Sequence, residues 1–194
     1  MTSTSEKAVA TRCFAGIDPS LTGTGVCVLM DGEEPLIQTI TTLPKTHPII
    51  FDRLKYIVRK ISDILFKDYD FGPDDVICIE RPFVSPKNMN SQQSLLVLSH
   101  LIRQDLYERQ MPWKNVSPMT LKKFVCGKGN AEKSMMLMRV YQHWDISAND
   151  DNQADAVGLA HMAKVMDALR GNGDRDRWPK YQLEVVKSML AKGD

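Results

Sequence analysis

"DNQADAVGLAHMAKVM", residues 151–166, reads as a long apolar helix that nevertheless opens with carboxylates. Asp151 and Asp155 lie one turn apart on the same helical face. An apolar stripe continues that face at helical spacing: Leu159, Met162, Met166 and Leu169. The opposite face is expected to carry the charged and polar side chains His161, Lys164 and Asp167. The segment predicts a core-facing helix with an acidic pair at its head.

The acidic pair has two interpretations, helix capping and a ligand site. Acids in a first helical turn are favoured by ~0.3–1 kcal/mol each, so one of Asp150, Asp151 and Asn152 is expected to cap the helix. Asp155 lies past the cap and faces inward, where a carboxylate is costly unless it is paired or binds a metal. The segment alone leaves both interpretations open.

The composition is that of an ordinary globular protein. The chain has 194 residues, of which 43% are hydrophobic and 25% charged, and its formal net charge is +1. A net charge this small gives no global attraction to nucleic acid, so any basic surface must be local. No apolar run approaches the ~18 residues that a membrane span needs, and the first residues lack the apolar core of a signal peptide. We expect a cytoplasmic protein.

The four cysteines follow no metal-binding or disulfide pattern. Cys13, Cys27, Cys78 and Cys126 are scattered, and no CxxC pair occurs. Three of them sit in apolar runs typical of strands. We therefore expect reduced cysteines, most of them in the core.

The order of expected elements predicts one α/β domain with a mixed sheet of about five strands between helical layers. Strands are expected at residues 12–20, 24–32, 34–43, 74–82 and 113–118. Helices are expected at residues 47–69, 90–110, 117–127, 130–144, from 151 onward, and 180–190. We expect a disordered leader at 1–11, the main domain at 12–171 and a C-terminal helical extension at 172–194.

Two further carboxylates stand where expected strands end. Asp18 closes the first strand and Glu80 closes a short buried strand. Open α/β sheets place ligands at the carboxyl ends of their strands. If these strands are neighbours, the two acids converge with Asp155 and Asp151, and no basic partner is obvious. Such a cluster repels itself unless hard cations hold it, and two Mg²⁺ ions would suit phosphoryl transfer.

Each acid also has a structural interpretation when it is taken alone. Asp18 precedes a proline and could simply form a turn, and Glu80 could be a solvated charge at a strand end. The joint placement of the acids favours a site.

Four segments together resemble a known family. GIDPSLTGTGVCVL, IERPFVSPKNMNSQQSLLVLSHLI, VSPMTLKKFVCGKGNAEKSMML and DNQADAVGLA occur in the order and spacing of RuvC-like Holliday junction resolvases, members of the ribonuclease H-like nuclease superfamily. The resemblance covers roughly residues 13–171. The compact length and the leader also look like those of a phage-encoded member, so the resemblance implies the cytoplasm of a bacterial cell or a phage-infected host.

The resemblance implies a ribonuclease H-like fold and a homodimer. It also implies a Mg²⁺-dependent endodeoxyribonuclease, with Mn²⁺ as a substitute, that resolves four-way DNA junctions by paired symmetric nicks in recombination and repair. The alternatives are a related nuclease with broader preference for flaps, forks or RNA–DNA hybrids, and a non-catalytic junction-binding protein. The sequence carries no signal for or against a branch-migration helicase partner.

By position, the resemblance implies that Asp18, Glu80 and Asp155 are metal ligands. A fourth ligand would be Asn152, three residues before Asp155, or Asp151, four residues before it. A carboxylate binds a hard cation more strongly than an amide, so Asp151 is favoured. Asn152 remains a candidate ligand or cap.

A basic segment follows the fifth expected strand. It supplies Lys122, Lys123, Lys128 and Lys133 around two glycines, which suits phosphate binding and equally suits a solvated lysine face. It does not fit a P-loop, because Glu132 occupies the place of the second glycine. The resemblance favours DNA binding by the four lysines, and it implies that Lys122 and Lys133 lie near the scissile phosphate. Lys133 is accordingly a candidate catalytic residue.

Three further features have two interpretations each. Phe83, in the loop after Glu80, is either tucked into the core or, by the resemblance, stacks on bases at the junction centre. The helix at 90–110 is either entirely core or part of a dimer interface. In the extension, Trp178 and Tyr181 could dock onto the body or onto a partner.

Overall fold

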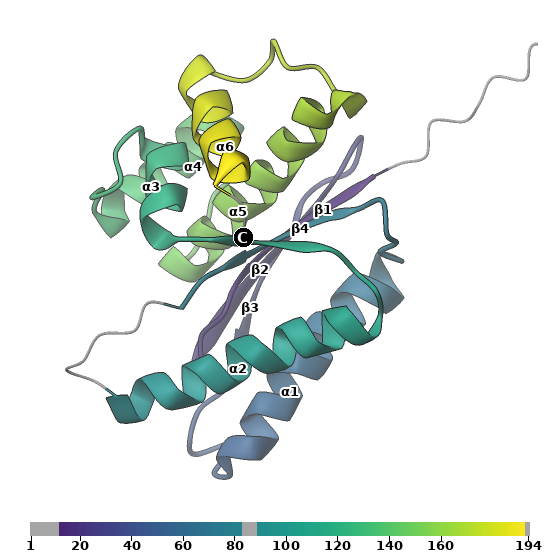
Figure 1. The fold of residues 1–194 in the computed structure, drawn as a ribbon. Helices are drawn as coiled ribbons and strands as arrows, with labels where there is room; N and C mark the ends of the chain where they lie inside the picture. The colour runs from purple at the N-terminus through teal and green to yellow at the C-terminus, as the bar shows by residue number, and fades with distance from the viewer. Residues whose placement is uncertain (1–11, 83–88, 193–194) are drawn as a thin grey trace, which may run out of the picture.

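The computed structural model describes residues 12–82 and 89–192, so the expected leader and Phe83 lie outside the described residues. Five strands form one mixed sheet in the order β3-β2-β1-β4-β5 (Figure 1). The strands are β1 (Cys13–Asp18), β2 (Gly23–Met30), β3 (Leu36–Thr41), β4 (Val76–Glu80) and β5 (Trp113–Val116). β1, β2 and β3 pair antiparallel, whereas β1, β4 and β5 pair parallel. The predicted mixed α/β sheet is confirmed.

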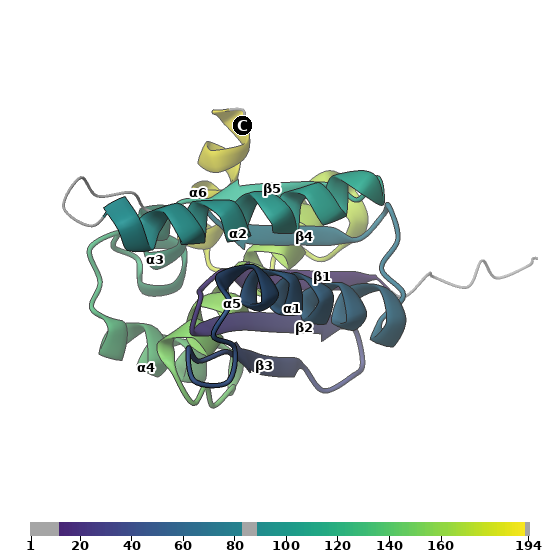
Figure 2. The same ribbon diagram turned by 90° about the horizontal axis from the view of Figure 1, so that it is seen from below.

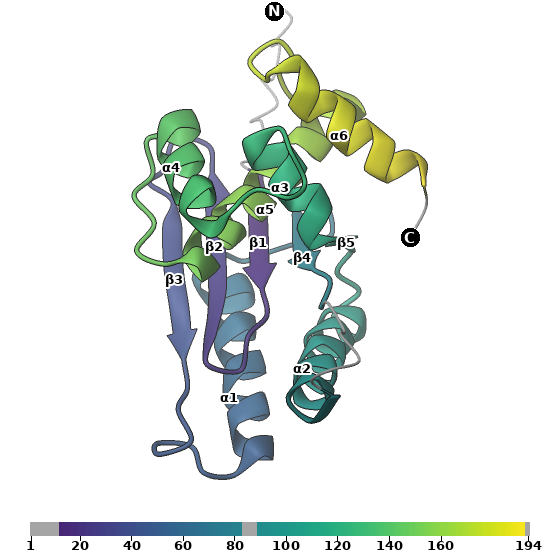
Figure 3. The same cartoon turned by 90° about the vertical axis from the view of Figure 1, so that its left-hand side faces the viewer.

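Helices cover both faces of this sheet (Figures 1 and 2). The helices are α1 (Ile50–Asp63), α2 (Met89–Glu108), α3 (Pro118–Cys126), α4 (Lys133–Trp144), α5 (Asp151–Asp167) and α6 (Lys180–Ala191). Single π-helical turns continue α1 (Ile64–Asp68) and α5 (Ala168–Asn172). α1 and α2 lie on one face, and α5 lies on the other beneath α3, α4 and α6 (Figure 3).

Alternation along β1 divides the core into two layers. Phe14 packs in the cluster that contains α5, whereas Cys13, Ala15 and Ile17 pack in the cluster that contains α1 and α2. Successive side chains of a strand point to opposite faces, so this division follows directly from the sequence. All four cysteines are free, and Cys13, Cys27 and Cys78 are buried, as expected.

The prediction that His161 and Asp167 lie on a solvent-exposed face of α5 is wrong. His161 and Asp167 are only 7% and 2% exposed, because α4 and α6 cover the side of α5 that faces away from the sheet. His161 stacks on Trp144 with ring centroids 3.8 Å apart, and burial lowers the pKa of His161 to about 3. Asp167 forms an ion pair with Arg12 at 2.5 Å. The helix is therefore enclosed on both sides, and Asp167 is paired rather than solvated.

The C-terminal helix docks onto the body of the protein. Val185 and Val186 of α6 belong to the same core cluster as α5. Trp178 packs its edge against His161 at 6.1 Å, and the Tyr181 hydroxyl lies 3.3 Å from Nε2 of His143. Trp178 and Tyr181 therefore pack against the body of the protein. The boundary between the main domain and the C-terminal extension, at residues 171 and 172, remains a prediction.

Within residues 12–82 and 89–192, no helix combines the length and the apolar character that crossing a membrane demands.

Candidate active site

Asp18 and Glu80 are the last residues of neighbouring parallel strands. β1 and β4 pair in register, with Ile17 beside Ile79, so the two acids follow side by side at the carboxyl edge of the sheet. Strand alternation directs both side chains to the face that α5 covers. The sheet topology that the sequence left conditional is therefore present.

α5 approaches the sheet closely because two glycines leave room for it. A Cβ at Gly16 would lie 2.0 Å from the carbonyl oxygen of Ala156, and one at Gly25 would lie 2.1 Å from that of Asn152. Any side chain at either position would push the helix away from β1 and β2. Gly16 and Gly25 thus set the depth at which α5 presents Asp155.

The start of α5 is fixed by Asp150, which settles the question of the cap. Oδ1 of Asp150 accepts a hydrogen bond from the backbone N–H of Gln153 at 2.8 Å, as an N-cap does. Oδ2 of the same side chain accepts from the Thr39 hydroxyl of β3 at 2.9 Å. Asp155 therefore has no part in capping.

Three carboxylates meet at this edge of the sheet. One oxygen from each of Asp18, Glu80 and Asp155 lies within 4.8 Å of the other two. Asp18 is 7% exposed, and the other two side chains are half-buried. Among the described residues, this is the one group of three or more potential ligands close enough to share a metal ion.

The electrostatics of the three acids fit a hard cation. Burial, together with the charges of Glu80 and Asp155, raises the pKa of Asp18 well above its usual range. Burial and the charges of Glu80 and Asp151 raise the pKa of Asp155 to about 7, and burial raises that of Glu80. Oxygen ligands crowded at this distance are what Mg²⁺ and Mn²⁺ prefer. The donor set therefore matches such an ion.

The expectation that the acids have no basic partner is wrong. Lys133, at the start of α4, forms an ion pair with Asp151. This contact lowers the pKa of Asp151 and raises that of Lys133. Lys122 of α3 also lies near enough for its charge to lower the pKa values of Glu80 and Asp155. Asp151 thus pairs with Lys133 and is not one of the three carboxylates close enough to share a metal ion.

The structure separates the other predicted site residues. Lys123 lines a groove between α3 and α6 whose lining includes none of the three acids, and Lys128 is exposed in the loop before α4. Nδ2 of Asn152 would lie 3.1 Å from a Cβ at Gly23, so this amide faces β2, on the side of β1 opposite Glu80. This position favours Asp151 over Asn152 beside the three acids.

The sequence reasoning missed residues that position the site. Gly25 controls the approach of α5, and Thr39 holds the helix cap from a strand two places away from β1. Gly23 and Gly25 at a spacing of two on one face of a strand are a signal of close backbone approach. No comparable signal marks Thr39, because its partner is 111 residues away in the chain.

The chain matches an established family over most of its length. The family model described as "Crossover junction endodeoxyribonuclease RuvC" matches residues 14–162. The protein of that name from Rickettsia bellii is 29% identical over 161 residues, which cover 77% of this chain and 95% of the relative. The one from Cytophaga hutchinsonii is 28% identical over 191 residues, covering 93% and 91% of the two chains.

Solved structures show the same fold. The structure titled "Thermus thermophilus RuvC structure" has a TM-score of 0.63 at 20% identity, over 82% of this chain and 97% of that one. A second Thermus thermophilus RuvC structure, in complex with Holliday junction substrate, has a TM-score of 0.62 at 19% identity, over 83% and 97%. The predicted ribonuclease H-like architecture is confirmed. The chain belongs to the RuvC family of crossover junction endodeoxyribonucleases.

Proposed function

We propose that this enzyme is a metal-dependent, structure-selective endonuclease that resolves four-way DNA junctions by paired symmetric nicks. The observation that carries the proposal is the meeting of Asp18, Glu80 and Asp155 within 4.8 Å in a chain of the RuvC family. A relative of the same fold is known in complex with a Holliday junction substrate. We place the enzyme in the cytoplasm, in DNA recombination and repair.

Asp18, Glu80 and Asp155 would hold Mg²⁺, with Mn²⁺ as a substitute. When bound, such ions activate a water molecule and stabilise the leaving oxygen in phosphodiester hydrolysis. The protein contributes three partly desolvated carboxylates on rigid elements, two at strand ends and one on an enclosed helix. Rigid placement of ligands limits the reorganisation that the reaction requires.

Lys133 and Asp151 would change partners when DNA binds. Their ion pair is largely open to solvent, with side-chain exposures of 78% and 38%, so it is weak enough to exchange. A DNA phosphate would attract Lys133, and Asp151 would then be free to act as a fourth ligand. Lys122 and Lys133 would together neutralise the scissile phosphate, and Lys123 and Lys128 would contact DNA further away.

Two symmetric nicks require two active sites, so the enzyme would act as a two-fold dimer. α2 is the candidate interface, because Leu98, Ile102 and Leu106 fill the core while Val97 and Tyr107 are 43% and 74% exposed.

Phe83 would stack on bases opened at the centre of the junction.

Nicking of a synthetic four-way junction tests this proposal against a matched linear duplex, a flap and an RNA–DNA hybrid, each with Mg²⁺ and with EDTA. Paired symmetric nicks in the junction alone, lost with EDTA, are the expected result. Equal cleavage of the flap or the hybrid would replace the resolvase with a broader nuclease. Tight junction binding without cleavage of any substrate would indicate a non-catalytic binding protein.

A further inference from the structure

A groove of about 590 Å³ runs between α3 and α6, with the ends of β4 and β5 forming one side. Its lining includes three cationic side chains, those of Arg81, Lys123 and Lys192, and one carboxylate, that of Glu184. All four side chains are exposed. The groove therefore presents an excess of positive charge on a chain whose net charge is only +1.

The groove opens at the same edge of the sheet as the three acids. Arg81 directly follows Glu80, and its backbone N–H donates to the carbonyl oxygen of Val116 at 2.7 Å, which joins the ends of β4 and β5. Lys122 and Lys123 are neighbours on α3, where successive residues are turned by about 100°. The charge of Lys122 acts on Glu80, whereas Lys123 lines the groove. α3 thus lies between the acids and the groove and supplies one lysine to each.

The floor of the groove is also suited to an anion. Ser117 caps α3 by accepting a hydrogen bond from the N–H of Thr120 at 3.1 Å, and both residues line the groove. The positive end of the α3 dipole therefore adds to the lysine charge. Asn115 accepts hydrogen bonds from Arg103 at 2.7 and 2.8 Å, so a fourth cation stands directly behind the lining.

α6 completes this surface although it lies beyond the part of the chain that matches the family model, which ends at residue 162. We propose that the α3–α6 groove binds the phosphodiester backbone of a junction arm next to the cleaved strand. The C-terminal helix then extends the DNA-binding surface past the active site. This inference rests on the proposed function, because cleavage at the acids brings a DNA backbone to this edge of the sheet.

Salt dependence of junction binding distinguishes a phosphate contact from a structural role. Each phosphate contact that is removed lowers the slope of log binding constant against log salt by about 1. We expect that reduction for Lys123→Ala and for Lys192→Ala, and about 2 for the double variant. Glu184→Gln removes a repulsive charge and is expected to strengthen binding about twofold to fivefold. A gain of this kind cannot come from misfolding.

The variants are made in the Asp155→Asn background, which is expected to block cleavage, and are measured by fluorescence anisotropy with a labelled four-way junction across a salt series. Lys187→Ala is the matched control, because Lys187 is an exposed α6 lysine that does not line the groove. Thermal melting checks that each variant is folded.

The expected result is a reduced slope for the two groove lysines, an unchanged slope for Lys187→Ala, and tighter binding for Glu184→Gln. If the groove-lysine variants have the same slope as Lys187→Ala, in a parent protein that binds the junction, the groove does not bind the DNA backbone. That result would leave the proposed function intact. A parent protein without preference for the junction over linear duplex would instead contradict the proposed function, and the groove with it.

Discussion

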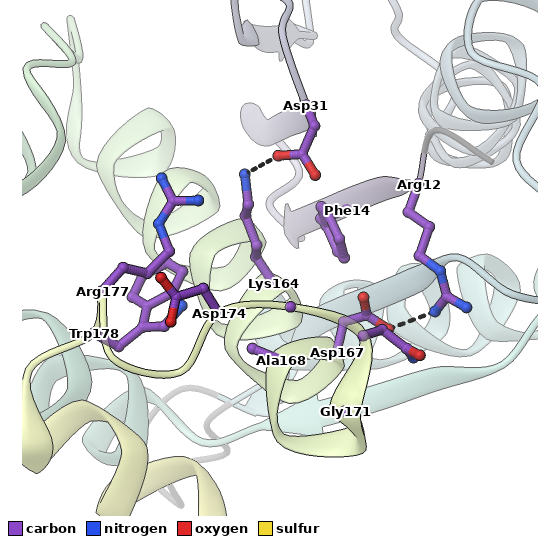
Figure 4. Close-up of a pocket in the computed structure, with 12 residues that line it drawn as sticks. Arg12, Phe14, Asp31, Lys164, Asp167, Ala168, Gly171, Asp174, Arg177 and Trp178 are labelled. Carbon is purple, nitrogen blue, oxygen red and sulfur yellow. Dashed lines mark hydrogen bonds and ion pairs between the residues drawn. The ribbon is translucent and has the colours of Figure 1, made fainter. Parts of the chain in front are cut away.

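The two ends of α5 both bring acids against the sheet, but only one end supplies each acid with a full ion pair. At the C-terminal end, Asp167 pairs with Arg12 and Lys164 pairs with Asp31, each at 2.5 Å. These pairs lie on the walls of a pocket of about 530 Å³ that also contains Phe14 and Trp178 (Figure 4). At the N-terminal end, Asp18, Glu80 and Asp155 crowd together instead.

This difference separates a structural role from a ligand site. Removing one partner of a buried ion pair leaves the other charge unpaired, which destabilises the fold. Three crowded carboxylates with raised pKa values oppose folding until a cation or protons neutralise them. The two ends of α5 can therefore be compared directly, because Asp155→Asn and Asp167→Asn should have different consequences.

The largest effect is expected from Asp155→Asn. Loss of one ligand of the three-acid cluster should reduce junction cleavage in Mg²⁺ by at least about 1,000-fold, as removal of a catalytic group does in other enzymes. Asp167→Asn should retain cleavage. Single-turnover nicking rates provide the measurement, and comparable rates for the two variants would remove the distinction between the two ends of the helix.

Lys133→Met should lower the nicking rate by about 100-fold, since one charged donor to the scissile phosphate is lost. Mg²⁺ binding should persist, because Asp18, Glu80 and Asp155 are unchanged and Asp151 is released. The measurement is a rate at saturating Mg²⁺ alongside a Mg²⁺ titration. A loss of rate that excess Mg²⁺ fully restores would assign Lys133 to metal binding rather than to phosphate binding.

Asp167→Ala should lower the free energy of unfolding by about 1–3 kcal/mol, because it leaves the partly buried guanidinium of Arg12 without its carboxylate. Asp31→Ala is the matched control. Its side chain is 63% exposed, so the loss there should stay below about 1 kcal/mol. Urea denaturation measures both variants, and equal losses would contradict the structural role assigned to Asp167.

A pH dependence of stability is also expected. Asp155 has a pKa of about 7 in the folded chain against an ordinary value of 3.8, so between these values the folded state binds a proton that the unfolded state has released. The free energy of unfolding should therefore decrease as the pH rises through this window. Melting in EDTA at about pH 5 and about pH 8 measures the decrease, which should be smaller in Asp155→Asn. A decrease of the same size in both proteins would show that Asp155 makes no contribution.

The fold could largely be predicted because its signals are local. Alternation in β1 and the helical spacing of Leu54, Ile57 and Ile61 in α1 are properties of short windows, and the structure follows both. The burial of His161 and Asp167 could not be predicted this way. It depends on α4 and α6 packing over α5, and on Arg12 lying 155 residues from its partner.

The candidate site could likewise be predicted only where its signals are local. The positions of Asp18 and Glu80 at strand ends, and of Asp155 inside a helix that starts at Asp151, are local signals that predict the three acids. The ion pair between Lys133 and Asp151 was missed, because it joins the first residues of two helices whose relative placement no window of sequence records. The groove beside Lys123 was missed for the same reason, since α6 forms its other wall.

The most direct measurement of the central claim is a calorimetric titration of Mn²⁺ into metal-free wild-type protein, Asp155→Asn and Asp167→Asn. Each acid-to-amide change removes one carboxylate from one end of α5 and preserves its shape. We predict binding to the wild type and to Asp167→Asn, with binding lost or greatly weakened in Asp155→Asn. Binding to Asp155→Asn with wild-type affinity would show that the three-acid cluster is not the metal site.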